Sequence, residues 1–221
     1  MGSTMEPYAV EPEVPVVKIL LLGDAGVGKS TFLSRLTLGH NAAETGTAGP
    51  GPPPPYELPR LRDLDQPFVF AVTLFARPYR FEMYDTASPT NYTLLAPDFL
   101  ILCYDVTSRA SLESLTTRWR RELETHFGAA VEARVPVMVL GLKRDLRRDW
   151  TDEERLALKG EHVMPQEGLG AAQKMRCDAY AECSAVTGEL CREVLEDVTK
   201  MAAKTTTENG AKTPGTSCGV M

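Results

Sequence analysis

The chain has 221 residues, a formal net charge of −6 and 43% hydrophobic residues, enough for one α/β core with additional tails or insertions. The negative charge and the lack of a basic run interleaved with aromatic residues argue against nucleic acid as a partner. Five scattered cysteines without a C-x-x-C pair argue against a disulfide framework or zinc site and favour a reducing, cytoplasmic setting. The sequence has no apolar stretch of membrane-spanning length and no signal-peptide pattern at its start.

The first predicted elements are a strand over residues 16–22 and a helix over residues 31–38. The strand is a continuous apolar run, and Phe32, Leu33 and Leu36 recur at helical spacing. Between them lies a G-x-x-x-x-G-K-S loop, whose residues expected at a nucleotide are Asp24, Ala25, Gly26, Val27, Gly28, Lys29, Ser30 and the following Thr31. Backbone N–H groups of such a loop wrap phosphates, while Lys29 would neutralise phosphate oxygens and the Ser30 hydroxyl would ligate Mg²⁺. The loop therefore predicts nucleotide binding.

The remaining chain alternates between strands and helices after one irregular segment. Residues 40–67 lose all periodicity and are expected to form a loop, and the runs 68–76 and 79–84 then form an antiparallel hairpin. Further strands are predicted at 99–104, 135–140 and 180–183, and further helices at 111–127, 168–175 and 190–203. This order predicts an α/β fold, a mostly parallel six-stranded sheet with helices on both faces and a ligand at the carboxyl ends of its strands.

Three further motifs follow predicted strands, where this topology would place a nucleotide. They are Asp85-Thr86-Ala87, Lys143-Arg144-Asp145 and Cys183-Ser184-Ala185. Asp85 could hold Mg²⁺ through water, although alone it could also close an ordinary turn. With the phosphate loop, and in this order, the motifs resemble the Ras-type small GTPases over about residues 16–203.

The resemblance implies a P-loop GTPase domain that binds GTP and GDP. Asp145 would accept hydrogen bonds from the guanine N1–H and 2-amino groups, and the stem of Lys143 would lie along the ring. The Ala185 N–H would meet the base oxygen, with Ser184 beside it in the same motif.

Within the superfamily, the chain resembles the Rho branch. Residues 151–154 form a capping box, Gly160 follows, and a short helix is expected over residues 151–159, where Rho proteins carry an insert helix. A solvated charged helix in another GTPase branch is the alternative.

Departures from the family fall on the switch regions. The family pattern Asp-x-x-Gly-Gln is replaced here, so that Ser88 stands for the glycine and Pro89 for the glutamine that orients water. Proline offers neither an amide side chain nor an N–H group. Ala25 occupies the position of a second family glycine and would crowd the transferring phosphoryl group. These changes predict nucleotide binding with slow or absent intrinsic hydrolysis.

Two further departures concern binding. Leu142 replaces the Asn or Thr of the base-recognition motif, so a polar tie to the phosphate loop is lost. Switch I contains an insertion placed at about residues 41–66, and Thr47 is a weak candidate for its Mg²⁺-binding threonine. Effector proteins and exchange factors are implied as partners, but contacts typical of Rho are not assumed.

The chain ends and the insertion carry separate signals. Pro50 to Pro55 contains two P-x-x-P patterns that SH3, WW or profilin-type surfaces can read, with a disordered spacer as the alternative. Residues 1–15 and 204–221 are expected to be flexible, and the last four residues, beginning at Cys218, fit a prenylation box. A single prenyl group gives reversible membrane binding, so we expect exchange between the cytosol and the cytoplasmic face of a membrane.

Three hypotheses remain open at this point. The first is a Rho-like GTP-binding signalling protein with weak hydrolysis, and the second is a working GTPase whose catalysis a partner assists. The third is a pseudo-GTPase without nucleotide, motivated by Leu142 and the missing switch I threonine. An ATP-using kinase is disfavoured because Asp145 in its motif has no use for adenine.

Overall fold

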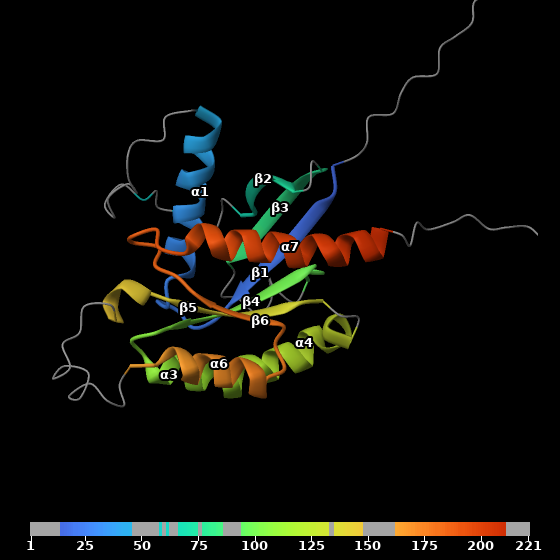
Figure 1. The fold of residues 1–221 in the computed structure, drawn as a ribbon. Coiled ribbons are helices and arrows are strands. Elements are labelled where there is room, and N and C mark those ends of the chain that lie inside the picture. The colour runs from blue at the N-terminus through green and yellow to red at the C-terminus, as the bar shows by residue number, and fades with distance from the viewer. Residues whose placement is uncertain are drawn as a thin grey trace, which may run out of the picture.

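The computed structural model describes residues 14–45, 58, 61, 66–74, 77–85, 94–132, 135–147 and 162–210. These residues form a six-stranded sheet with the order β2-β3-β1-β4-β5-β6 (Figure 1). Neighbouring strands are parallel except for the β2–β3 hairpin, and their bounds are β1 Val16–Leu22, β2 Phe68–Leu74, β3 Arg77–Asp85, β4 Phe99–Asp105, β5 Val137–Leu142 and β6 Ala179–Glu182. The predicted α/β class and mostly parallel sheet are confirmed.

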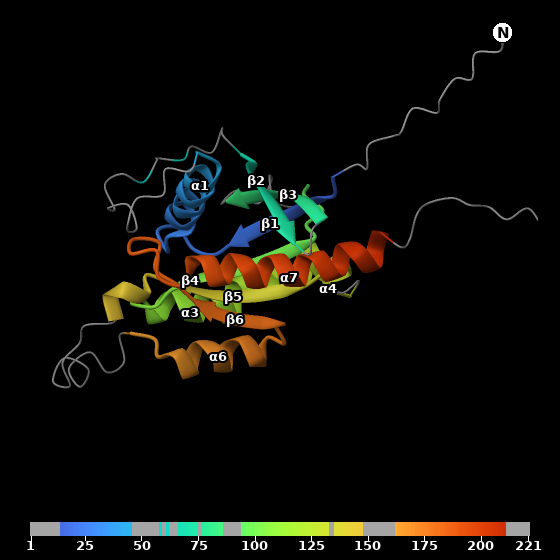
Figure 2. The ribbon, with the colours of Figure 1, turned by 45° about the horizontal axis from the view of Figure 1, so that its top comes forward.

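Helices cover both faces of the sheet, as Figures 1 and 2 show. One face carries α1 (Lys29–Thr45) and α7 (Cys191–Gly210). The other carries α6 (Pro165–Lys174) and a continuous helical segment made of α3 (Arg109–Ser114), the π-helical turn η3 (Leu115–Trp119) and α4 (Arg120–Glu132). A short 3₁₀ turn, η4 (Arg144–Arg147), follows β5.

The central strands are apolar because both of their faces are covered. Along β1, Ile19 and Leu21 join the core beneath α1 and α7, whereas Leu20 and Leu22 join the core beneath α3 and α6. All four side chains are fully buried. The sheet is therefore packed between two apolar layers, and the loops that follow the carboxyl ends of its strands are available to form a site.

Several element ends differ from the sequence predictions. The predicted loop from residue 40 is wrong at its start, because α1 continues to Thr45 and takes in the first residues of the expected insertion. Ala42 and Ala43 favour helix, and no glycine or proline interrupts residues 40–45. The helix expected from residue 111 begins at Arg109, because the Ser108 side chain caps it by accepting from the Ser111 N–H. Helix α7 continues past residue 203 to Gly210.

The expected insert helix at residues 151–159 lies outside the described residues. Among the helices of the described residues, none combines the length and the apolar content that crossing a membrane requires.

Candidate nucleotide-binding site

The phosphate loop connects the carboxyl end of β1 to α1, in the middle of the sheet. Gly23 has a φ of 146°, and a Cβ placed on it would lie 2.3 Å from the Cys103 carbonyl oxygen on β4. Only glycine fits at this position, because other residues rarely adopt this backbone conformation and a side chain would collide with that carbonyl. Ala25 and Gly26 are exposed at the tip of the loop, whereas Val27 is 3% exposed and packs into the core.

Three residues of the sequence motifs meet at the start of α1. The Lys29 ammonium group donates to the carbonyl oxygens of Gly23 and Asp24 at 2.9 and 3.0 Å, and lies 3.7 Å from Asp85 Oδ1. The Ser30 hydroxyl donates to Asp85 Oδ2 at 2.5 Å. Asp85, at the end of β3, is thus placed beside both phosphate-loop side chains.

This donor set fits a magnesium ion. Mg²⁺ prefers oxygen ligands and usually takes one or two protein ligands together with water and substrate phosphates. Ser30 and Asp85 supply a hydroxyl and a carboxylate in contact with each other. Within the described part of the chain, no group of three or more His, Cys, Asp or Glu side chains could form a larger metal cage.

The Asp24 carboxylate has a role that sequence analysis missed. Its Oδ1 accepts hydrogen bonds from Trp119 Nε1 at 2.8 Å and Ser114 Oγ at 2.9 Å, and lies 3.6 Å from Arg118 Nη1. The phosphate loop is therefore tied to the π-helical turn η3. Because η3 departs from the regular helical period, amphipathic spacing could not have indicated this contact.

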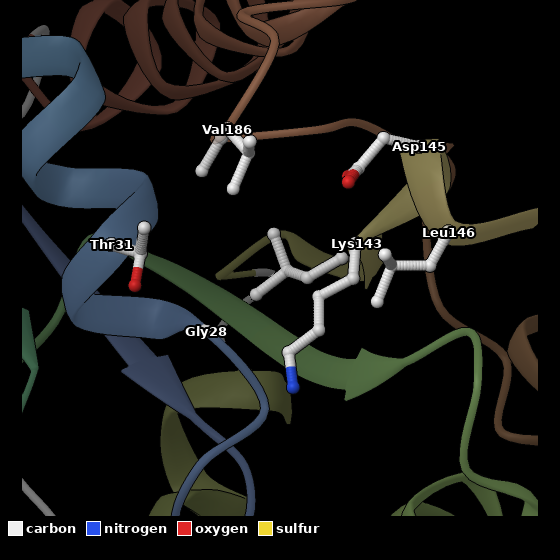
Figure 3. Close-up of a pocket in the computed structure, with 8 residues that line it drawn as sticks. Gly28, Thr31, Lys143, Asp145, Leu146 and Val186 are labelled. Carbon is white, nitrogen blue, oxygen red and sulfur yellow. The ribbon is translucent and has the colours of Figure 1, made fainter. Parts of the chain in front are cut away.

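A cavity of about 240 Å³ adjoins the phosphate loop. It is lined by Gly28, Thr31, Leu142, Lys143, Asp145, Leu146, Ala185 and Val186. Figure 3 shows Thr31 and Val186 on one side of it, Asp145 and Leu146 on the other, and Lys143 between them. The lysine, aspartate and alanine expected at guanine therefore line one hollow next to the loop expected at the phosphates.

Hydrogen bonds fix the polar side chains of this cavity. Lys143 has a left-handed φ of 64°, and its Nζ donates to Asp105 Oδ2 at 2.7 Å. The fully buried Ser184 donates through its hydroxyl to Asp145 Oδ1 at 2.5 Å, and Ser184 Oγ itself accepts from the Thr187 N–H at 3.1 Å. Ser184 thus orients Asp145 and does not itself line the cavity.

A buried hydrogen-bond network connects η4 to β6 and β4. Arg147 donates to the Glu182 carboxylate and, at 2.5 Å, to the Val163 carbonyl oxygen. The hydroxyl of Tyr180 donates to the same carboxylate and lies 3.0 Å from the hydroxyl of Tyr104. Burial raises the pKa of both tyrosines, so the hydroxyls stay protonated and serve as donors.

Leu142 is 1% exposed and belongs to the core at the floor of the cavity. Its aliphatic side chain cannot form the polar tie that an Asn or Thr would provide at this position.

The remaining predicted site residues, Thr47, Ser88, Pro89 and Cys218, lie outside the described residues, as does the segment from Pro50 to Pro55.

Comparison with known proteins gives consistent matches. The family model described as "Ras family" matches residues 67–204. The human "Rho-related GTP-binding protein RhoF" is 29% identical over 210 residues, covering 92% of this chain and 88% of that protein. The "Rho-related protein racL" of Dictyostelium discoideum is 27% identical over 197 residues, covering 84% of this chain and 88% of that protein.

Proposed function

The chain belongs to the Ras family as a Rho-like small GTPase, and from this premise we propose that it is a GTP- and GDP-binding signalling protein. One observation supports the proposal: Lys143, Asp145 and Ala185, expected at guanine, line one cavity next to the phosphate loop, where Ser30 contacts Asp85. The proposed binding domain spans residues 16–203.

The phosphate end of the site has its charges arranged for an anion. The Lys29 ammonium now donates to two backbone oxygens of the loop, and phosphate oxygens would take over as acceptors. Mg²⁺ would neutralise phosphate charge when bound. Ser30 would ligate it directly, and Asp85 would hold it through water.

The base end of the site is built for guanine. The Asp145 carboxylate can accept two hydrogen bonds from neighbouring N–H groups, which guanine presents at N1 and its 2-amino group. Ser184 restrains that carboxylate, and Ala185 lines the same cavity with a backbone N–H for the base oxygen. Adenine offers no such arrangement, and an apolar cavity lined by a few placed polar groups suits a flat base.

We infer that intrinsic hydrolysis is slow or absent. Pro89 has no group that could orient the attacking water, and Ser88 replaces the glycine whose N–H would sense the γ-phosphate. Ala25 adds a methyl group at the exposed tip of the phosphate loop. A GTPase that a partner assists and a nucleotide-free interaction module are the competing hypotheses.

We further propose reversible membrane attachment through a prenyl group on Cys218, with exchange between the cytosol and a cytoplasmic membrane face. The partners would be effector proteins and exchange factors. The prolines from Pro50 to Pro55 would offer a polyproline helix to SH3, WW or profilin-type surfaces.

The direct test is chromatography of the nucleotide released when freshly purified protein is denatured. Mostly GTP supports binding with weak hydrolysis, mostly GDP refutes the proposed weak hydrolysis, and no guanine nucleotide in a folded protein refutes binding. The variant Asp145→Ala should copurify with less guanine nucleotide.

Single-turnover hydrolysis of bound GTP then tests the switch II argument. The double substitution Ser88→Gly and Pro89→Gln should increase the rate strongly if the missing glutamine limits it. An unchanged rate would favour a partner-assisted GTPase.

A further inference from the structure

A buried arginine joins α1 to the loop that lines the base side of the cavity. Arg35 lies on α1 and is 6% exposed. Its Nε donates to the Ala185 carbonyl oxygen and its Nη2 to the Val186 carbonyl oxygen, each at 2.5 Å. One guanidinium group therefore holds two consecutive peptide groups that line the cavity.

The chemistry of arginine suits this task. Its guanidinium is planar and presents several donors in a fixed fork, so it can bind two carbonyls with one rigid group. Hydrogen bonds from a charged donor are about twice as strong as neutral ones. Burial lowers the pKa of Arg35 by desolvation, yet an arginine in a protein stays protonated and continues to donate.

Arg35 lies on the helix that begins at the phosphate end of the site, and its side chain reaches the base end. The same helix begins with Lys29 and Ser30, which face the Asp85 carboxylate at the phosphate end. The Ala185 and Val186 carbonyls belong to the loop between β6 and α7, about 150 residues later in the chain. The rigid helix thus connects the phosphate end of the site with its base end.

Leu142 explains why such a connection is needed. It lies between the phosphate loop and the base-recognition residues, and an ideal Cβ on Gly28 would be 3.7 Å from its Cδ1. A leucine makes only apolar contact there, where the family pattern has a side chain that forms hydrogen bonds.

We propose that Arg35 is a positioning residue that holds the Ala185–Val186 segment against α1, in place of the polar tie absent at Leu142, and so slows nucleotide dissociation. The inference rests on the proposed binding of guanine nucleotide. It adds a role for a residue outside the sequence motifs.

The test uses the full-length protein loaded with a fluorescent GDP analogue, whose release is followed after addition of excess GDP. Arg35→Met removes both hydrogen bonds and should accelerate release by about tenfold or more. Arg35→Lys keeps the charge but replaces the planar fork with a single nitrogen on a flexible stem, so it should hold the two carbonyls less firmly and its release rate should lie between those of the wild type and Arg35→Met. Arg192→Met is the matched control. The Arg192 side chain is 84% exposed on α7, and in the contacts described it pairs with Glu196 of the same helix. The Arg192→Met protein should release the analogue at the wild-type rate.

Two readouts separate positioning from general loosening of the fold. Compared with the wild type, Arg35→Met should lose more of the analogue to excess ADP, because the segment that carries the Ala185 N–H is no longer held in position for the guanine oxygen. In a Leu142→Thr background, which restores a hydroxyl beside the phosphate loop, the effect of Arg35→Met should shrink. If Arg35→Met does not fold, as judged by circular dichroism, Arg35→Lys carries both comparisons.

The outcomes separate the two proposals. Wild-type protein that binds no GDP analogue would refute the proposed function and this inference together. Wild-type protein that binds it, with Arg35 variants releasing it at the wild-type rate, would overturn the inference alone. Equal acceleration with and without Leu142→Thr would refute the proposed replacement of the missing tie.

Discussion

The buried carboxylate of Glu182 offers a quantitative test of how the base-recognition loops are supported. It accepts from Arg147 and from the Tyr180 hydroxyl, with the Tyr104 hydroxyl 3.5 Å from Oε1. The side chains of Arg147 and Glu182 are 9% and 7% exposed. The substitution Glu182→Gln keeps the size of the side chain and removes its charge, so Arg147 loses its buried partner.

The expected loss of stability follows from that burial. Removing one member of a buried ion pair costs about 3–5 kcal/mol, because the other charge remains desolvated. Arg147 keeps its hydrogen bond to the Val163 carbonyl oxygen, which places the cost near the lower end, about 3 kcal/mol. For a domain of this size, each kcal/mol lowers the melting temperature by about 2–4 °C, so a decrease of about 6–12 °C is expected.

Urea unfolding followed by circular dichroism, with GDP and Mg²⁺ held at one saturating concentration, measures this cost. Glu196→Gln is the control, because Glu196 is 49% exposed and its pairs with Arg192 and Lys200 lie at the surface. Surface pairs contribute about 0–1 kcal/mol, so the control should change stability little. A loss below about 1 kcal/mol for Glu182→Gln, or one equal to the control, would refute the reasoning.

Three further predictions concern the phosphate loop and its surroundings. Gly23→Ala should prevent stable folding or nucleotide retention, because its Cβ would meet the Cys103 carbonyl at 2.3 Å; copurified nucleotide and circular dichroism measure both. Trp119→Phe removes the indole donor to Asp24 and should cost about 1.5–3 kcal/mol in urea unfolding, whereas no loss would show that the hydrogen bond is dispensable. Burial raises the pKa of the Cys103 thiol to about 12, so at pH 8 it should react with a thiol reagent only after denaturation, and equal rates in native and denatured protein would contradict this.

Periodicity predicted most of the fold because parallel strands covered on both faces are continuous apolar runs. The strand predicted at residues 16–22 coincides with β1, and the predicted hairpin corresponds to β2 and β3. Prediction was weakest at helix ends, where local propensity competes with capping. The last residues of α1, up to Thr45, include helix-favouring alanines but form no apolar stripe. Because an apolar stripe is the pattern that predicts a helix, the sequence did not indicate this extension.

The supporting contacts of the candidate site could not be predicted in this way. Trp119 reaches Asp24 across 95 positions, and Arg35 reaches Ala185 across 150. No periodic spacing or sequence motif links the two residues of either pair, because each contact depends on which helix covers which end of the sheet. Motifs identified the residues expected to touch the nucleotide, whereas the residues that hold them in place emerged only from the three-dimensional arrangement.

This difference bears on whether the chain binds nucleotide at all. Judged alone, Leu142 favours a pseudo-GTPase, because it removes a polar tie from the base-recognition motif. Arg35 supplies another tie at the same end of the site, with two hydrogen bonds from a charged donor to the loop that carries Ala185. Leu142 is therefore a poor argument against binding unless Arg35 is removed as well. Under the pseudo-GTPase hypothesis the wild-type chain binds no GDP analogue, so Arg35→Met has no release to accelerate. Under the binding hypothesis the wild-type chain retains the analogue despite Leu142, and Arg35→Met releases it faster.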